Sequence, residues 1–162
     1  MPQEGTLQWQ ASPGQMADEW AIQRLARLYA RAMDRNLPDI IGAIFTEDAV
    51  LDRAGQLREG RARLMQIPPW LRERYLSTLH KIHNQLVTVT GDTAEGETYC
   101  TAEHLEHDRG GGTTLYSMSI RYQDRMVRQK DAWRFQRRTL VIEWTDVRQV
   151  LWQNGLPAVS TK

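Results

Sequence analysis

The sequence contains very little cysteine and no long apolar run. Only Cys100 is a cysteine among the 162 residues, which excludes an internal disulfide framework and a metal site built from several cysteines. No apolar run approaches the roughly 20 residues that a membrane-spanning helix needs. The first residues, Met1 to Gly5, lack the basic and apolar regions of a signal peptide. We therefore expect a soluble, cytoplasmic protein that makes no membrane contact.

The sequence also has almost no net charge and little phenylalanine. Its 21 basic and 20 acidic side chains leave a net charge of +1, whereas a dedicated nucleic-acid binder normally carries a clear basic excess. A chain of this length forms one domain and buries enough surface to build a core without crosslinks. What the sequence does have is tryptophan, with six residues against two phenylalanines. These features favour an enzyme or binding domain for a small molecule rather than a partner of nucleic acid.

The first half of the chain has helical periodicity. Apolar residues recur at spacings of three and four from Asp18 to Asn36, and Leu37-Pro38 ends this pattern. The following sequence predicts short helices at about residues 38–45, 61–67 and 70–79 and a short strand at 49–52. Residues 1–16 are predicted to be a mobile arm, and residues 146–162 a tail or lid with a short helix at its start.

The second half of the chain alternates apolar and polar residues, as strands do. Strands are predicted at about residues 82–90, 95–107, 114–127 and 132–144. Helices followed by long antiparallel strands are typical of the α+β class. We therefore expect residues 17–145 to form a cone-shaped α+β barrel, with the N-terminal helices packed in the concavity of a curved, mainly antiparallel sheet. The mouth of such a cone is a natural site for a ligand.

Several local phrases occur in an order that resembles a known family. These are Ala21 to Tyr29, Ala32-Met33-Asp34, Phe45 to Val50, Gly60-Arg61, Ile82 to Gln85 and Trp133 to Arg138. Together they are similar to the SnoaL-like branch of the nuclear transport factor two-like superfamily. The resemblance covers residues 17–145 and implies the barrel fold. It is less specific for a reaction, because this superfamily contains isomerases, dehydratases, cyclases, epoxide hydrolases and non-enzymes.

Within this superfamily the sequence most resembles the His–Asp lyases: scytalone dehydratase, bile-acid 7α-dehydratase and hexachlorocyclohexane dehydrochlorinase. These enzymes place an Asp near the end of the first long helix and a His at the opening of a strand. Asp34 and His83 occupy these positions. The resemblance also assigns a catalytic role to Tyr29, which precedes the Asp by five residues, and a substrate-binding role to Arg138.

The residues themselves are compatible with this assignment. A carboxylate in the last helical turn is disfavoured by roughly 0.3–1 kcal/mol, because the helix dipole is negative there, so Asp34 needs a partner. An imidazole would be such a partner, and the carboxylate would fix its tautomer. His80 and His83 face opposite sides of a strand, and we expect His83 to point inward because it opens the alternating run. The Tyr29 phenol could give a proton to a leaving hydroxyl group.

Other candidate residues are open to more than one interpretation. Strand alternation turns Arg138 outward if Trp133 and Phe135 pack inward, unless a bulge intervenes. The polar residues 103–108 could mimic a set of metal ligands, but we expect a solvated strand end, because alternation separates His104 from His107. Possible pocket-lining residues, each of which could equally pack in the core or at an interface, are Trp70, Tyr116, Met118 and Trp144.

The sequence supports three hypotheses about function. The first is a lyase that needs neither cofactor nor metal and acts on a hydrophobic aromatic, polyketide-like or steroid-like small molecule. It would release water or another small group such as formaldehyde, with His83 as base, Asp34 orienting it and Tyr29 assisting. The second is an isomerase or cyclase in which Asp34 moves the proton. The third is a non-enzymatic ligand-binding domain. In each case we expect a homodimer or homotrimer formed through the outer sheet face.

Overall fold

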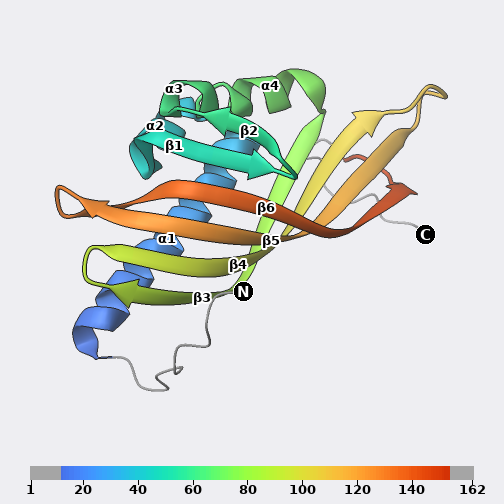
Figure 1. Cartoon of the computed structure of the whole chain (residues 1–162). Helices are drawn as coiled ribbons and strands as arrows, with labels where there is room; N and C mark the ends of the chain where they lie inside the picture. The colour runs from blue at the N-terminus through green and yellow to red at the C-terminus, as the bar shows by residue number, and fades with distance from the viewer. Residues whose placement is uncertain (1–11, 154–162) are drawn as a thin grey trace.

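The fold was analysed in a computed structural model that describes residues 12–153; residues 1–11 and 154–162 lie outside the described part. Helices and strands follow one another as expected for an α+β protein, and Figure 1 shows their arrangement. In chain order the elements are α1 (Pro13–Arg35), α2 (Pro38–Ile44), β1 (Phe45–Arg53), β2 (Gln56–Glu59), α3 (Arg61–Leu64), α4 (Ile67–Arg74), β3 (Ser77–Thr90), β4 (Thr93–His107), β5 (Thr113–Gln129) and β6 (Ala132–Gln149).

The strands form one curved sheet in the order β2-β1-β6-β5-β4-β3. All neighbours are antiparallel except β1 and β6, which run parallel. Helix α1 crosses behind the long strands in Figure 1, and α2, α3 and α4 gather at the end of the molecule near β1 and β2. The predicted α+β cone, with helices packed against a mainly antiparallel sheet, is confirmed.

Helix α1 begins earlier than the sequence pattern indicated. Ser12 caps it, because the Ser12 hydroxyl accepts a hydrogen bond from the Gln15 backbone N–H at 3.3 Å while the Gln15 side chain accepts one from the Ser12 N–H at 2.8 Å. Pro13 occupies the first helical turn, where its missing N–H costs nothing. The predicted arm over residues 1–16 is therefore wrong for residues 13–16, and residues 1–11 lie outside the described part. At the other end, Asn36 adopts a left-handed conformation with φ 52°, which ends the helix.

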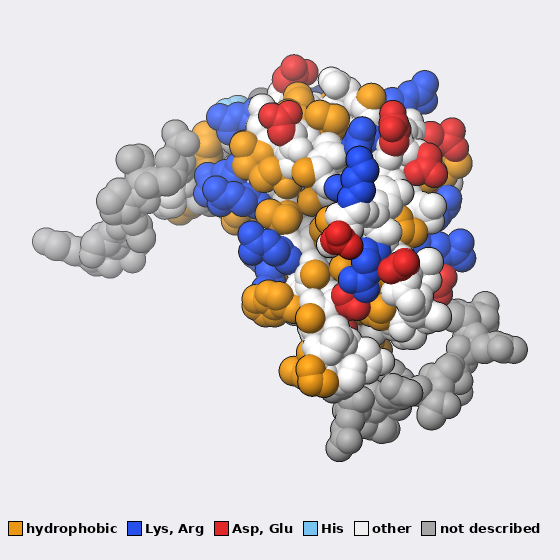
Figure 2. Space-filling view, turned by 90° about the vertical axis from the view of Figure 1, so that its left-hand side faces the viewer, with side chains coloured by type: hydrophobic (Ala, Val, Ile, Leu, Met, Phe, Trp, Pro, Cys, Tyr) orange, Lys and Arg blue, Asp and Glu red, His pale blue; other side chains and the backbone are white. Residues whose placement is uncertain are grey.

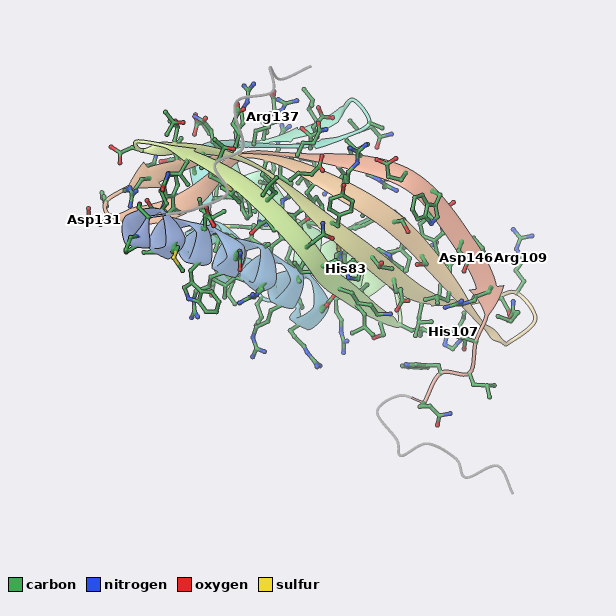
Figure 3. The ribbon with its side chains drawn as sticks, turned by 90° about the horizontal axis from the view of Figure 1, so that it is seen from below. His83, His107, Arg109, Asp131, Arg137 and Asp146 are labelled. Atoms are coloured by element: carbon green, nitrogen blue, oxygen red, sulfur yellow. The ribbon has the colours of Figure 1, made fainter. Side chains whose placement is uncertain are left out.

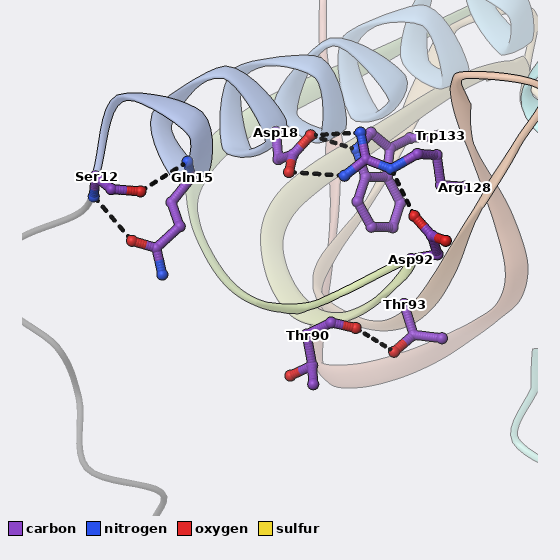
Figure 4. A network of polar contacts seen from close by, with 8 residues as sticks. All are labelled: Ser12, Gln15, Asp18, Thr90, Asp92, Thr93, Arg128 and Trp133. Atoms are coloured by element: carbon purple, nitrogen blue, oxygen red, sulfur yellow. Dashed lines mark hydrogen bonds and ion pairs between the residues drawn. The ribbon is translucent and has the colours of Figure 1, made fainter.

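The start of α1 is fastened to the sheet by Asp18 (Figure 4). Its carboxylate accepts hydrogen bonds from Arg128 at 2.9 and 2.8 Å and from the Trp133 indole N–H at 3.0 Å. Arg128 also donates to the Asp92 carboxylate at 3.0 Å. The bonds from Arg128 and Trp133 outweigh partial burial and hold the pKa of Asp18 below its usual range. This contact joins the first turns of α1 to the turns at the ends of β3 and β5.

Two predicted helices are shorter or absent in the structure. Pro68 and Pro69 lie in the first turn of α4 rather than ending a helix, and β3 already begins at Ser77. The tail helix predicted from Thr145 is replaced by the end of β6, which pairs with β5 as far as Gln149. In Figure 3 the end of β6 and the turn between β4 and β5, marked by Asp146 and Arg109, extend well beyond α1. The last nine residues, which were predicted to belong to a tail or lid, lie outside the described part.

The concave face of the sheet and one side of α1 form a single hydrophobic core. Each long strand contributes alternate residues, such as Ile120 and Tyr122 from β5, and α1 contributes Ile22, Tyr29 and Met33. Trp133 and Phe135 of β6 are also buried, whereas Trp20 is exposed. No helix in the described part of the chain has the length and apolar character needed to cross a membrane.

Replacing Asp18 by Asn should lower the free energy of unfolding by about 1–2 kcal/mol near neutral pH, because a charged acceptor shared by Arg128 and Trp133 is lost. Since folding lowers the pKa of Asp18, its contribution is present above the unfolded-state pKa and disappears as the pH falls through the folded-state pKa. Urea unfolding at several pH values measures this difference. Glu19→Gln, the neighbouring carboxylate change, is the control, and an equal loss in both variants would contradict the assignment.

Candidate functional site

Asp34 and His80 form a buried pair where the end of α1 meets the start of β3. The Asp34 Oδ1 atom lies 2.7 Å from His80 Nδ1, and the Asp34 side chain is 14% and the His80 side chain 6% exposed. Asp34 also accepts hydrogen bonds from the Thr78 hydroxyl and from the backbone N–H of His80, each at 2.9 Å. The carboxylate thus has three donors, all from β3, and its orientation is fixed.

These hydrogen bonds determine the charge state of Asp34. Burial alone would raise the pKa of this carboxyl group, but the hydrogen bonds and charge of His80 and the Thr78 hydroxyl outweigh burial and lower it. An ionised Asp34 can only accept a hydrogen bond, so His80 Nδ1 carries the proton toward it. In the neutral form of this ring the other nitrogen, Nε2, carries the free lone pair and is the one that can accept a proton.

The expected pair of Asp34 with His83 is wrong. His83 is exposed on β3 (labelled in Figure 3), and its Nε2 atom lies 2.8 Å from the Thr101 hydroxyl. The reason is that the strand begins at Ser77 rather than at about residue 82. Alternation from this earlier start turns Thr78, His80 and Ile82 toward the helix, and a bulge between Ile82 and Gln85 then shifts the register.

Tyr29 lies beside His80 on the buried side of α1. Its ring packs edge-on against the rings of His80 and Tyr122, with centroid distances of 6.3 and 5.8 Å. Burial raises the pKa of Tyr29 to about 12, although the charge of Arg138 acts in the opposite direction. The phenol therefore keeps its proton across the physiological range and is available as a donor.

Arg138 points into the core because of a bulge in β6. Phe135 faces Met126 and Arg137 faces Arg125, so Gln136 is an extra residue that reverses the alternation. The bulge that the sequence reading left open is present, and both Phe135 and Arg138 are buried. Arg138 makes two hydrogen bonds to Asp124, at 2.8 and 2.7 Å.

The Arg138 guanidinium is enclosed by aromatic rings. Its central carbon lies 4.4 Å from the ring centre of Tyr29 and 4.1 Å from those of Tyr122 and Phe135, close enough for cation–π attraction. Burial by itself would lower the pKa of Arg138, but the Asp124 carboxylate more than compensates and raises it. The Arg138–Asp124 ion pair thus packs directly against the Tyr29 ring. The Nη1 atom of Arg138 is buried without a hydrogen-bond partner among the described residues.

The sequence reading missed His104 as a member of this group. We expected a solvated strand end, yet the His104 side chain is only 4% exposed. His104 lies on β4 directly opposite Thr78 of β3, and both side chains face inward. Its ring lies 5.7 Å from that of His80 and 4.7 Å from that of Tyr75. Burial and the neighbouring His80 lower the pKa of His104 to about 4, so its imidazole is neutral. The alternation of β4 could have predicted that His104 faces inward, once the pairing of Thr78 with His104 was known.

The four other predicted pocket residues fall into two groups. Met118 is buried on the same face as His104, and Tyr116 packs against the His104 ring at 6.3 Å. Trp70 lies on α4, 43% exposed, and packs edge-on against Tyr75. Trp144 is 67% exposed and pairs with Ser119, so it lies on the opposite face of the sheet from Met118. Tyr116 and Met118 therefore border the Asp34–His80 group, Trp70 lies outside it, and Trp144 is remote from it.

Other candidate chemistry is not supported by the geometry. Burial raises the pKa of the Cys100 thiol to about 11, despite a hydrogen bond with Tyr122 and the charge of Arg138, so Cys100 is a poor nucleophile. In the part of the chain that the structure describes, no three His, Cys, Asp or Glu side chains come together as a metal ion would require. Glu103 and Glu106 instead form ion pairs with Lys81 and Arg74.

Arg138→Met should cost about 3–5 kcal/mol of unfolding free energy, because the Asp124 carboxylate would remain buried without a counter-charge. Adding Asp124→Leu should recover at least about 2 kcal/mol of this loss, since a matched apolar pair leaves no buried charge. Urea unfolding followed by tryptophan fluorescence measures the double variant and each single variant. If the loss of unfolding free energy in the double variant equals the sum of the losses in the two single variants, the ion pair does not account for the stability of this region.

The chain matches the SnoaL-like domain over residues 14–139. It is 30% identical over 131 residues to the uncharacterized protein Rv2910c of Mycobacterium tuberculosis, an alignment that covers 78% of this chain and 86% of the relative. The domain match takes in nearly all of α1, which carries Asp34, and the whole of β3 and β4, which carry His80 and His104; it ends within β6 at Thr139.

Solved structures share the fold at lower identity. A candidate scytalone dehydratase from Novosphingobium aromaticivorans superposes with a TM-score of 0.71 at 22% identity, covering 81% of this chain and 87% of that one. A hexachlorocyclohexane dehydrochlorinase from Novosphingobium barchaimii superposes with a TM-score of 0.68 at 18% identity, covering 82% and 91%. At these identities the likeness establishes the fold. With the match to the domain itself, it identifies the chain as a member of the SnoaL-like family, within the nuclear transport factor two-like superfamily.

Proposed function

We propose that this protein is a cofactor-independent lyase in which His80 is the base and Asp34 orients it. The observation that carries the proposal is the 2.7 Å contact between Asp34 Oδ1 and His80 Nδ1 in a nearly buried setting. This contact leaves Nε2 unprotonated and stabilises the imidazolium that forms when Nε2 takes a proton. His80 thus takes over the role that the sequence reading gave to His83.

The proposed reaction is an elimination. His80 Nε2 removes a proton from a carbon next to a carbonyl group or an aromatic system, and the electrons of that C–H bond form the new double bond as the leaving group departs. Tyr29, next to His80, supplies the proton with which a hydroxyl leaves as water. The Tyr29 phenolate is then reprotonated from the His80 imidazolium, which restores both groups. Another small group, such as formaldehyde, can be released by related acid–base steps.

The residues around His80 favour a hydrophobic substrate. Tyr29 and His104 pack against the His80 ring, and further aromatic rings surround these two, with Tyr122 on Tyr29 and Tyr75 and Tyr116 on His104. An aromatic, polyketide-like or steroid-like small molecule matches such a lining. The neutral His104, with its Nδ1 atom buried and unpartnered among the described residues, offers a hydrogen bond to a polar group of that substrate. Both solved relatives named above carry lyase-type names, which supports the same class of reaction.

The geometry favours a lyase over an isomerase or cyclase with Asp34 as the base. All three hydrogen bonds to Asp34 come from β3, and they lower the pKa of its carboxyl group. A base whose proton affinity is lowered and whose oxygens are engaged is poorly suited to shuttle a proton directly. A purely non-enzymatic binding domain would use the Asp34–His80 contact to position α1 but would have no use for a proton acceptor at His80 Nε2.

The proposed enzyme acts in the cytoplasm as a homodimer or homotrimer. The support for association is the end of β6, where Trp144 and Val147 are 67% and 62% exposed and residues 143–149 are exposed on both faces of the strand. Apolar side chains in such a position are typical of a subunit contact.

Replacing His80 by Ala should lower turnover by about 10²–10⁴-fold, because the general base is lost. His83→Ala, the matched control three residues away, should retain nearly full turnover. The measurement is the appearance of conjugated-enone absorbance from a panel of aromatic and steroid β-hydroxy ketones, or the exchange of their acidic C–H protons in D₂O. Normal activity in the His80 variant would eliminate the proposal.

The pH profile of kcat/KM tests the roles of His80, Asp34 and Tyr29 together. Because the pKa of Asp34 is lowered, Asp34 stays ionised in mild acid, so a loss of activity on acidification should come from protonation of the imidazole base and not of the carboxylate. On the basic side, a Tyr29 pKa of about 12 keeps the phenol protonated, so activity should persist to about pH 10. Activity that continues undiminished below about pH 5 would instead indicate a carboxylate base.

A further inference from the structure

A hollow of about 280 Å³ lies on the outer side of the helix end that carries Asp34. It is bounded by the last turns of α1, by α4 and by the first residues of β3. Its polar lining includes Arg31, Arg35 and Arg72 together with Asn36 and Ser77. Asp34 and Thr78 line it, whereas His80 and His104 do not, so the hollow borders the interior group described above on the side of Asp34.

The hollow carries an excess of positive charge. None of its three arginines forms an ion pair within 4 Å among the described residues, whereas the nearby Arg74 is paired with Glu106. The one acidic residue in the lining is Asp34, and its oxygens are already engaged by β3. Three cations around one space repel one another, and an anion between them would relieve this repulsion.

Stabilisation of the helix end explains only part of this arrangement. A basic residue in the last turn of α1, such as Arg35, interacts favourably with the negative end of the helix dipole. Arg72 lies in the last turn of α4 and is favoured in the same way by the dipole of that helix, but neither dipole requires arginines of two helices to converge on one hollow. Figure 2 shows several basic side chains on the left of this face, while at its centre and right basic and acidic side chains are mixed. The unpaired charge is therefore a property of the place where the two helices meet.

We propose that this hollow binds a carboxylate or phosphate group. Guanidinium groups hold such anions with paired N–H donors, and the Asn36 amide and Ser77 hydroxyl add neutral donors. Tyr75 lines the hollow and also packs against His104 at 4.7 Å. A ligand anchored by its anionic group would thus have its remaining part beside Tyr75, adjacent to the His80 group. The anion belongs either to the substrate, an assignment that rests on the proposed function, or to a free anion.

Phosphate titration of the ¹⁵N-labelled protein at constant ionic strength tests the site itself. We expect saturable shifts of the Arg31, Arg35 and Arg72 side-chain N–H signals, and binding weakened at least about tenfold in Arg31→Gln/Arg72→Gln. Arg24→Gln/Arg27→Gln, two exposed positions on the same helix outside the hollow, should bind as the wild type does. Equal weakening in both double variants, or shifts that do not saturate, would overturn the site. If the hollow double variant does not fold, Arg72→Gln alone should weaken binding about threefold.

Phenyl phosphate distinguishes the two sources of the anion. Binding at least about tenfold tighter than that of inorganic phosphate, with shifts of the Tyr75 and His104 ring signals, would assign the anion to the substrate. Equal affinity without ring shifts would assign it to a free anion. Both titrations measure binding without turnover, so failure of the proposed reaction and failure of this site give different results.

Discussion

The position of α1 against the sheet depends on two carboxylates, one near each end of the helix. Asp18 accepts hydrogen bonds from Arg128, at the end of β5, and from Trp133, at the start of β6. Asp34 accepts hydrogen bonds from the first residues of β3. Apolar packing between a helix and a sheet is non-directional and permits sliding, whereas hydrogen bonds to ionised acceptors fix register. Because the same contact with β3 orients His80, the bond that aligns the helix also prepares the proposed base.

A second constraint operates beneath Tyr29. A charged guanidinium with no exposed surface is tolerated because Asp124 makes two hydrogen bonds to it and three aromatic rings surround it. A core built from Leu alone would pack Tyr29 less specifically, since Leu offers no directional contact, whereas the guanidinium is attracted to the face of the Tyr29 ring. The pair therefore contributes to the shape of the site more than to its polarity.

Much of the fold could be predicted from the sequence, because its periodicities are long and distinct. The helical pattern before Asn36 and the alternation after His80 determine the layers, and Asp34 and Tyr29 were assigned to the site by the family resemblance. The choice between His80 and His83 failed because strand alternation fixes a face only after the first paired residue is known, and Ser77 and Thr78 carry no apolar signal. Arg138 shows the same limit, since a one-residue bulge at Gln136 reverses its direction and leaves no mark in the pattern.

Because β1 pairs in parallel with β6, the sheet is completed only after the last strand has been synthesised. Phe45 lies beside Phe135, and Leu51 lies beside Arg138. The first strand of the chain therefore cannot complete its pairing until the last strand has been synthesised. Until β6 leaves the ribosome, Asp124 has no counter-charge and β1 has only β2 as a neighbour. Contacts so distant in sequence are characteristic of slow, late steps in folding. The interior site is thus completed only when synthesis of the barrel is nearly finished, and no N-terminal fragment that lacks β6 contains it.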